Sequence, residues 1–198
     1  SELRCETCGI SKPIVGAVFS DEQFFPQDGQ RSKHGDYVPA RHGKFWIERI
    51  LGEEPTDSII DHIPAITAVV RRDRYCRNEI KCEVMRKVFK ELKLTQLNDH
   101  ATSCIKMVGG APPPVFTRAE KKLVEVKLNK IMDLFPVVCP DEKNKPYYPY
   151  FIYKIFEWTF RGDSEKLRVL DYIHVQSPPT VMKNDLNYAK ICARLDPE

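Results

Sequence analysis

The spacing of hydrophobic and polar positions changes near residue 40. Before that point no helical period is present, and the segment 14–21 (IVGAVFSD) is short, β-branched and bounded by glycine and proline, which predicts a strand. Segment 26–40 is polar and rich in turn-forming residues, which predicts a linker. Over residues 41–198, hydrophobic residues recur three or four positions apart, as they do along amphipathic helices.

The helical region divides at start and stop signals. The glycine pair 109–110 should end one helix, and Pro64 should break another into two short pieces. Thr117 begins a T-x-x-E capping box, whose helix is expected to stop before Pro136. The helices predicted from these signals cover residues 41–51, 56–75, 78–94, 97–108, 117–135, 148–160, 164–174 and 184–195. The segment SPP, residues 177–179, should separate the last two.

Two of these segments carry strong patterns. Segment 78–94 is strongly amphipathic, and its predicted buried stripe consists of Ile80, Val84, Val88 and Leu92, with Met85 and Phe89 beside it. The aromatic run 147–160 also has helical spacing, which favours a core helix over a platform on which single-stranded bases would stack.

The predicted fold class is therefore mainly α. Residues 41–198 would form a helical bundle, residues 26–40 a linker, and residues 1–25 a β-containing segment. Short connections favour antiparallel packing of neighbouring helices. The hydrophobic content of 42% supports a packed core. No run approaches the roughly 20 apolar residues that span a bilayer, so no membrane partner is expected.

The N-terminal stretch RCETCGI contains a possible zinc knuckle, Cys5-x-x-Cys8-Gly. Thiolates at this spacing are typical of structural zinc sites, and the glycine permits the tight turn. A redox motif would need a following helix to lower the thiol pKa, and Pro13 argues against one. Two free cysteines near the start of the chain are the plainer alternative. The seven cysteines are otherwise scattered, which favours a reducing compartment.

A structural zinc ion takes four ligands, and this chain offers no second knuckle. The next cysteine along the chain is Cys76, and His34 is isolated within the linker. The spacing therefore predicts that Cys5 and Cys8 form the second knuckle of a zinc ribbon and that the first lies upstream. The zinc site would be incomplete in this chain.

Basic residues cluster between residues 71 and 93, where nine lysines and arginines face four acids and give +5 in a chain whose net charge is +3. Clustered cations contact DNA phosphates, so this basic strip is the candidate DNA-binding surface. Its candidate residues are Arg71, Arg72, Arg74, Arg77, Lys81, Arg86, Lys87 and Lys90. Lys87, Lys90 and Arg86 should lie on the outer face of their helix. A solvated helix face is the alternative.

A helix–turn–helix with segment 97–108 as its second helix is one geometry for such a strip. That segment offers only Asn98, His100 and Lys106 to read bases, so contacts to the DNA backbone with limited sequence readout are expected. Helix capping would explain the polar cluster around His100.

His42 and Trp46 are four residues apart and should share one helix face. They could contact nucleic acid or a polymerase, but a structural pair with a buried tryptophan is favoured. The other histidines of the helical region are also expected to be structural. Sequence signatures of catalysis are absent: the chain has no G-x-S-x-G, phosphate loop or H-E-x-x-H motif, so no enzymatic activity is expected. A DNA-acting nuclease or recombinase would need a Mg²⁺-binding carboxylate cluster, and a pure protein–protein assembly module is the third alternative.

Several motifs resemble a known family. The stretch CETCGI followed by VGAVFSDEQFF resembles the second half of the zinc ribbon of transcription factor IIB-type proteins. The motifs YVPARHGKFWIERILGEE (37–54), LKLTQLNDH (92–100), GGAPPP (109–114) and YPYFIYKI (148–155) resemble, in this order, the late transcription factor three-like family of large nucleocytoplasmic DNA viruses. The resemblance covers about residues 1–160.

The resemblance implies a viral late-gene transcription factor that binds zinc, binds double-stranded promoter DNA and recruits the viral RNA polymerase in a transcription factor IIB-like manner. Other late transcription factors would be partners, and the helical body would have a cyclin-like core. His42, Trp46 and Arg49 lie in the first body motif and would be its contact residues. The implied location is the infected host cell, in a viral factory in the cytoplasm or in the nucleus, with packaging in the virion as an additional expectation.

Overall fold

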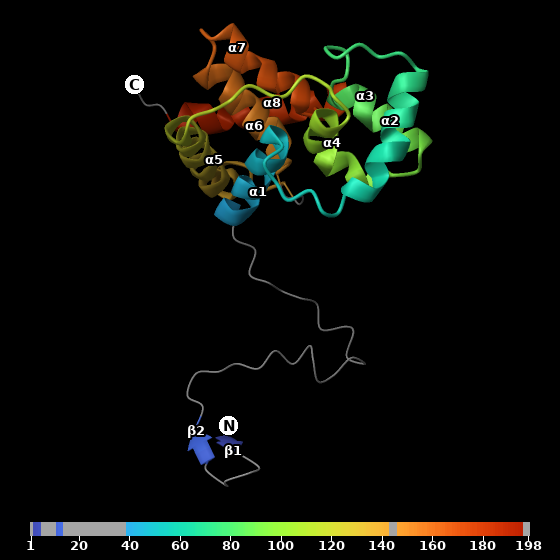
Figure 1. The fold of residues 1–198 in the computed structure, drawn as a ribbon. Helices are drawn as coiled ribbons and strands as arrows, with labels where there is room; N and C mark the ends of the chain where they lie inside the picture. Colours follow the sequence, from blue (N-terminus) through green and yellow to red (C-terminus); the bar gives the residue numbers. More distant parts are fainter. Residues whose placement is uncertain (1, 5–10, 14–38, 143–145, 196–198) are drawn as a thin grey trace. The chain divides into compact units, whose positions relative to one another are not determined.

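The computed structural model describes residues 2–4, 11–13, 39–142 and 146–195, and the chain divides into two compact units, residues 1–37 and 38–198 (Figure 1). In the first unit, β1 (Glu2–Arg4) pairs antiparallel with β2 (Ser11–Pro13). Cys5 and Cys8 fall between these strands in the sequence and lie outside the described residues, as do the predicted strand 14–21 and nearly all of the predicted linker. The zinc ribbon and the domain boundaries stay predictions.

The described part of the second unit is helical, which confirms a mainly α fold. Its elements are α1 (Pro39–Leu51), the 3-10 helix η2 (Ile60–His62), α2 (Ile63–Arg72), α3 (Cys82–Glu91), the 3-10 helix η3 (Thr95–His100), α4 (Ala101–Met107), α5 (Arg118–Val138), α6 (Tyr148–Thr159), α7 (Ser164–Leu167), the 3-10 helix η4 (Arg168–Tyr172) and α8 (Pro178–Leu195).

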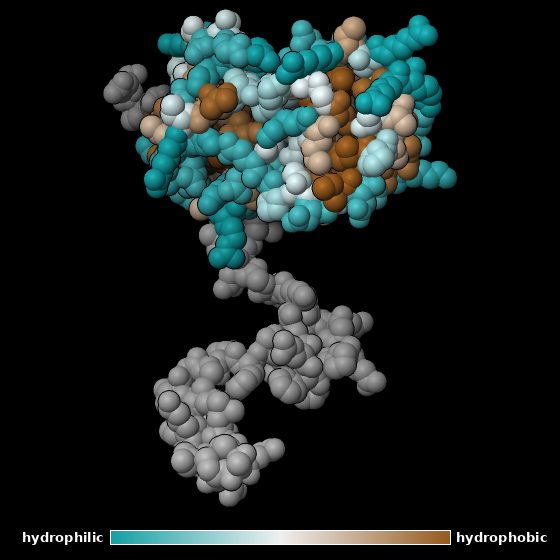
Figure 2. Space-filling model, viewed as in Figure 1, coloured by the Kyte–Doolittle hydropathy of each residue, from teal (hydrophilic) through white to brown (hydrophobic). Residues whose placement is uncertain are grey.

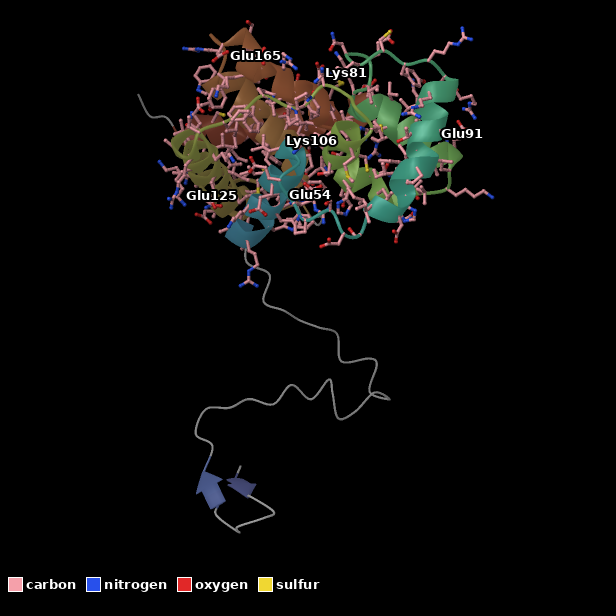
Figure 3. All side chains as sticks on the ribbon, in the orientation of Figure 1. Glu54, Lys81, Glu91, Lys106, Glu125 and Glu165 are labelled. Atoms are coloured by element: carbon pink, nitrogen blue, oxygen red, sulfur yellow. The ribbon has the colours of Figure 1, made fainter. Side chains whose placement is uncertain are left out.

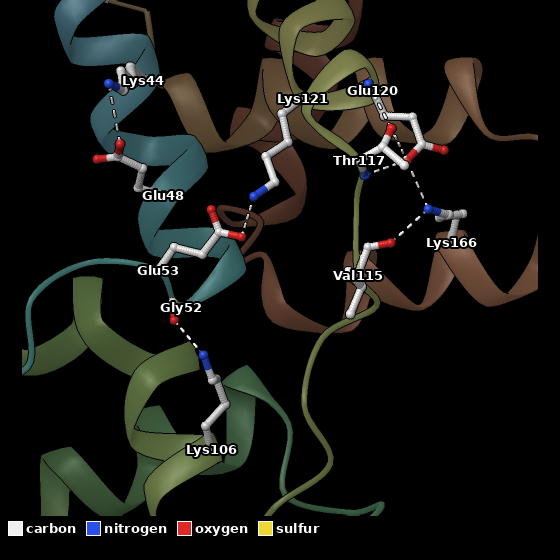
Figure 4. Close-up of polar contacts among 10 residues, drawn as sticks. All are labelled: Lys44, Glu48, Gly52, Glu53, Lys106, Val115, Thr117, Glu120, Lys121 and Lys166. Atoms are coloured by element: carbon white, nitrogen blue, oxygen red, sulfur yellow. Dashed lines mark hydrogen bonds and ion pairs between the residues drawn. The ribbon is translucent and has the colours of Figure 1, made fainter.

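The predicted capping box is present at the start of α5 (Figure 4). Thr117 Oγ1 accepts a hydrogen bond from Glu120 N at 3.2 Å, and the Glu120 carboxylate accepts one from Thr117 N at 2.7 Å. The predicted break before α2 is also confirmed, because η2 precedes a helix that has Pro64 in its first turn.

Two expectations about proline were wrong. Pro136 lies inside α5, whose hydrogen bonding continues from Cys139 N to Phe135 O at 2.9 Å. Pro178 begins α8 instead of separating it from the preceding element. A proline lacks an N–H group, but the first turn of a helix has no partner for that group, so proline is compatible with a helix start.

The α3 helix is shorter than predicted and turned about its axis. Its buried residues are Cys82, Met85, Val88 and Phe89, and Val84 is only half-buried. Ile80 is buried but precedes the helix, because Lys81 is extended (φ −105°, ψ 174°). The predicted stripe was wrong because it assumed a continuous helix from residue 78, whereas the helical period begins only after Lys81.

The second unit contains two hydrophobic clusters. One is built from α1, α5, α6 and α8, and the other from α2, α3, η3 and α4 (Figure 1). The aromatic run of α6 lies in the first cluster, where Phe151, Ile152 and Phe156 are fully buried, so its assignment as a core helix is confirmed. Outside these clusters the face seen in Figure 2 is mostly hydrophilic, although hydrophobic residues reach the surface between α2 and α4.

Polar contacts join α1 to both clusters. Gly52 ends α1 with a left-handed φ of 59°, which directs its carbonyl oxygen to Lys106 Nζ of α4 at 2.5 Å (Figure 4). On the other side, Lys121 of α5 forms an ion pair with Glu53. The turn after α1 therefore braces α4 and α5 together.

Candidate nucleic-acid interface

The basic strip forms the corner between α2 and α3. Arg71 and Arg72 occupy the last turn of α2, where positive charge is favourable to the helix dipole. Arg74 follows with a left-handed φ of 57°, a conformation that costs a non-glycine residue about 1 kcal/mol. Arg77 belongs to the exposed loop and Lys81 immediately precedes α3. The chain turn therefore gathers these cations onto one corner of the second unit.

Two residues of the strip are held by acids. The Arg72 guanidinium donates to both Glu91 carboxylate oxygens, at 2.7 and 3.0 Å, and to Asp73 at 2.7 Å. These hydrogen bonds lower the pKa of Glu91 and of Asp73 below their ordinary values. Lys81 Nζ contacts Asp171 of η4 at 3.0 Å. Figure 3 labels Lys81, immediately before α3, and Glu91, the last residue of α3. Arg72 thus ties α2 to the end of α3, and both cations are partly neutralised within the fold.

The rest of the strip is open to solvent, with one exception. Among the eight candidate residues, five have exposed side chains that form no ion pair with any residue in the described part of the chain: Arg71, Arg74, Arg77, Lys87 and Lys90. Lys87 and Lys90 lie on the outer face of α3, as expected. These five charges are the part of the strip that phosphate groups could reach.

Arg86 is the exception, because it is half-buried and turned toward the junction of the two clusters. It lines a cavity of about 30 Å³ together with Trp46, Tyr147 and His174. Burial raises the pKa of Tyr147 to about 12 and lowers that of His174, and the nearby Arg86 charge lowers both. The expectation that Arg86 belongs to the outer face of α3 was wrong, because α3 is rotated from its predicted orientation.

His42 and Trp46 contact each other on α1, but Trp46 is half-buried where a buried tryptophan was expected. Trp46 Nε1 donates to His42 Nε2 at 3.1 Å, and the His42 ring meets Tyr148 edge-on at 4.6 Å between centroids. Trp46 is half-buried against the first cluster. A role for either residue in binding nucleic acid or polymerase stays a prediction.

Arg49 belongs to a buried polar cluster that joins α1 to η3. Its Nη1 atom lies 2.9 and 2.8 Å from the two ring nitrogens of His100, and its guanidinium lies 4.1 Å above the Phe45 ring. A Glu54 oxygen is 3.4 Å from His100 Nδ1, and the Glu54 and His100 side chains are only 6% and 14% exposed. We assign the His100 proton to Nδ1, which places the N–H group toward Glu54 and lets Nε2 accept a hydrogen bond from Arg49.

This cluster corrects the expectation that capping explains His100. His100 occupies the N-cap position of α4, but its side chain makes no capping hydrogen bond. Glu54 was not identified from the sequence, because it lies in a loop whose hydrophobic pattern carries no signal for a buried carboxylate.

The helix–turn–helix geometry was also wrong. Residues 101–105 of α4 are buried, so this helix has no free face for a DNA groove. Asn98 is half-buried, His100 contacts Arg49, and Lys106 is hydrogen-bonded to Gly52. Asn98 and His100 are thus partly covered by the protein, and Lys106 is exposed but tied to the Gly52 carbonyl.

The described ranges show neither a metal cluster nor a membrane span. No group of three or more histidine, cysteine, aspartate or glutamate residues there could hold a metal ion, and no helix there is long and apolar enough to cross a bilayer. Burial raises the thiol pKa of Cys82 to about 11 and that of Cys104 to about 12, which makes both poor ligands and poor nucleophiles. Cys5 and Cys8, the predicted zinc donors, lie outside the described residues.

Comparison with known proteins identifies the relatives of the chain. Zinc finger protein B385R from isolates of African swine fever virus is 31% identical over 98% of this chain and 53% of its own length. The putative transcription factor R429 of Acanthamoeba polyphaga mimivirus is 24% identical over 77% of this chain and 35% of its own length. The chain thus spans about half the length, or less, of these curated relatives. No solved structure matches it, so the cyclin-like core stays a prediction.

The family model described as "Poxvirus Late Transcription Factor VLTF3 like" matches residues 32–198, which includes the whole second unit. This match confirms the resemblance inferred from the motifs. The chain therefore belongs to the poxvirus late transcription factor VLTF3-like family.

Proposed function

We propose that this viral transcription factor binds duplex promoter DNA through the exposed part of its basic strip and recruits the viral RNA polymerase in a transcription factor IIB-like manner. The observation that carries the proposal is the group of five exposed cations without acidic partners at the α2–α3 corner: Arg71, Arg74, Arg77, Lys87 and Lys90. They come from a helix end, a loop and a second helix, so they can follow a curved phosphate backbone.

The proposed DNA contact is mainly electrostatic. Because residues 101–105 of α4 are buried, α4 cannot serve as a helix that reads the major groove, and specificity from base edges would be limited. Each phosphate contact contributes a slope of about −0.9 to the dependence of log affinity on log salt concentration. Five contacts therefore predict a slope of about −4.5.

The proposed zinc site has two donors in this chain. Cys5 and Cys8 lie between two antiparallel strands in the sequence, and a thiolate pair between paired strands has the chemistry of half a structural zinc site. A relative bears the name zinc finger protein. Two further ligands would have to come from outside the described residues.

The proposed role is non-enzymatic and places the protein where the viral genome is expressed in the infected cell. Other late transcription factors are its proposed partners besides the polymerase. A nuclease or recombinase would cleave supercoiled DNA in the presence of Mg²⁺. If this activity co-purified with the chain, the proposed non-enzymatic role would be overturned.

Fluorescence anisotropy with a labelled 25-base-pair duplex over a range of salt concentrations tests the DNA contact. The variant Arg74→Ala/Lys87→Ala/Lys90→Ala should lose about 2.7 units of salt slope. The control variant Lys44→Ala/Lys122→Ala/Lys190→Ala removes the same charge from other elements and should keep the slope of the parent. Equal slopes in both triple variants would show that the strip is not the DNA-binding surface.

A further inference from the structure

A groove between α5, α6 and α8 is not used by the proposed function. Its volume is about 480 Å³, which is within the usual range for binding pockets. The lining residues are Lys127, Lys130, Ile131, Ile155, Trp158, Tyr188, Cys192 and Leu195. Ile131 and Ile155 are buried and supply an aliphatic floor that belongs to the first hydrophobic cluster. The floor of the groove is thus continuous with the first hydrophobic cluster, and its exposed apolar surface lies on the rim.

The rim of the groove exposes further hydrophobic surface. The Trp158 side chain is 59% exposed, and its ring is covered on one side by the Arg161 guanidinium at 4.3 Å. Leu123 and Val126 of α5 are also exposed, and each precedes a groove lysine by four residues. Residues four apart share one helix face, so this surface continues the groove along α5. Contiguous exposed apolar surface of this kind marks binding sites, and tryptophan is enriched among their strongest contacts.

The charge of the groove is positive. None of the lining residues is acidic. Lys127 Nζ donates to the neutral Thr159 hydroxyl at 3.0 Å, so its charge is not cancelled there. Lys130 is exposed and forms no ion pair with any residue in the described ranges, while the neighbouring Glu157 lies 3.8 Å from Lys154. An occupant should therefore carry carboxylates beside its apolar side chains.

We propose that this groove binds an acidic amphipathic helix of a partner protein. The apolar face of the helix would pack on Ile131 and Ile155 beside Trp158, and its carboxylates would reach Lys127 and Lys130. This is the helix-in-groove mode of recognition, in which anchors at i, i+3, i+4 and i+7 fill an apolar channel. The aliphatic floor favours a protein over nucleic acid, because bases stack on aromatic faces and only the rim offers an exposed one.

The test uses the full chain and a fluorescein-labelled synthetic helix of 16 residues. The probe carries leucine and tryptophan at i, i+3, i+4 and i+7 and aspartate or glutamate on the flanking positions. Anisotropy should show saturable binding that falls at least tenfold with Trp158→Ala and at least tenfold with Lys127→Glu/Lys130→Glu. A probe with asparagine and glutamine in place of its acids should bind equally weakly to the parent and to the charge-reversed variant.

Two matched controls should bind the probe as the parent does. Leu186→Ala removes another exposed hydrophobic side chain, on α8, at 67% exposure, and Lys44→Glu/Lys93→Glu reverses two exposed charges on α1 and after the end of α3. The parent chain alone allows a further measurement. The rate at which maleimide labels Cys192, followed by mass spectrometry, should fall at least fivefold with saturating probe.

The proposal is overturned by no probe binding at 1 mM chain, or by binding that Trp158→Ala leaves unchanged. Tighter binding of oligo(dT) than of the probe at the same residues would assign the groove to nucleic acid instead. Self-association that Trp158→Ala abolishes would assign it to a second copy of the chain. The basic strip shares no residue with the groove, so failure of this test leaves the DNA-binding proposal unaffected.

Discussion

Gly110 makes the sharpest test of how the segment after α4 packs. A Cβ atom added there would stand 2.6 Å from Ile105 Cγ2, 2.9 Å from the Ile105 carbonyl oxygen and 3.3 Å from Ile80 Cβ. The Ile105 side chain is fully buried, so it has little room to move. The carbonyl is backbone that accepts a hydrogen bond from Gly110 N at 2.8 Å, so relief of the contact must also disturb that bond.

Gly110→Ala should therefore lower the free energy of unfolding by about 2–3 kcal/mol. Overpacking a well-packed site costs about 1–3 kcal/mol, and the upper part of this range applies because a backbone atom must shift. At roughly 2–4 °C per kcal/mol for a unit of this size, the melting temperature should fall by about 4–12 °C.

Urea denaturation followed by circular dichroism measures this loss, with two glycine variants as controls. Gly162→Ala introduces a Cβ with no atom within 4 Å and should change the free energy of unfolding by less than about 0.5 kcal/mol. Gly109 also has open space around it but a φ of +87°, so Gly109→Ala should cost about 1 kcal/mol from backbone conformation alone. If Gly110→Ala proved as stable as Gly162→Ala, the close packing of this segment on Ile105 would be refuted.

Three further predictions concern the cap of α5, an acid-sensitive contact and the thiols. Thr117→Ala should lower the free energy of unfolding by about 1 kcal/mol in the same assay, and Thr117→Ser should retain most of it. Hydrogen bonds from Tyr150 and then from Lys154 lower the pKa of the Asp185 carboxyl below its ordinary value of 3.8. The ionised carboxylate therefore stabilises the fold above pH 3.8, and this stabilisation is lost as the pH falls through the lowered pKa. Between pH 6 and pH 2.5 the parent should thus lose more unfolding free energy than Asp185→Asn, and equal losses would refute the linkage. A thiol reagent should label exposed Cys76 within minutes in the native chain and buried Cys104 only after unfolding; equal native rates would contradict the burial of Cys104.

The sequence determined most of the helical elements because their signals are local. A capping box needs only Thr117 and a glutamate three residues later, and the spacing of α6 shows a buried face whatever it packs against. The motif order identified the family, which the family match over residues 32–198 confirms. The charge of the basic strip was equally visible, since charge is a property of composition.

Only the tertiary structure decided which of those cations lack an acidic partner and which side of α3 is buried in the core. Arg72 is held by Glu91, nineteen residues away, and Lys81 by Asp171, ninety residues away. Arg49, His100 and Glu54 meet because α1 packs against η3 and α4. No local period encodes these partners, because distant segments become neighbours only when the hydrophobic faces of their helices are buried together.

The groove of α5, α6 and α8 has the same origin. Lys130, Trp158 and Cys192 come from three helices, and each taken alone is an ordinary surface or half-buried position. Their convergence depends on how three helices cross, which is set by side-chain packing in the first cluster. Helical periodicity predicted which segments pack, and the packing itself determined the surface that they build together.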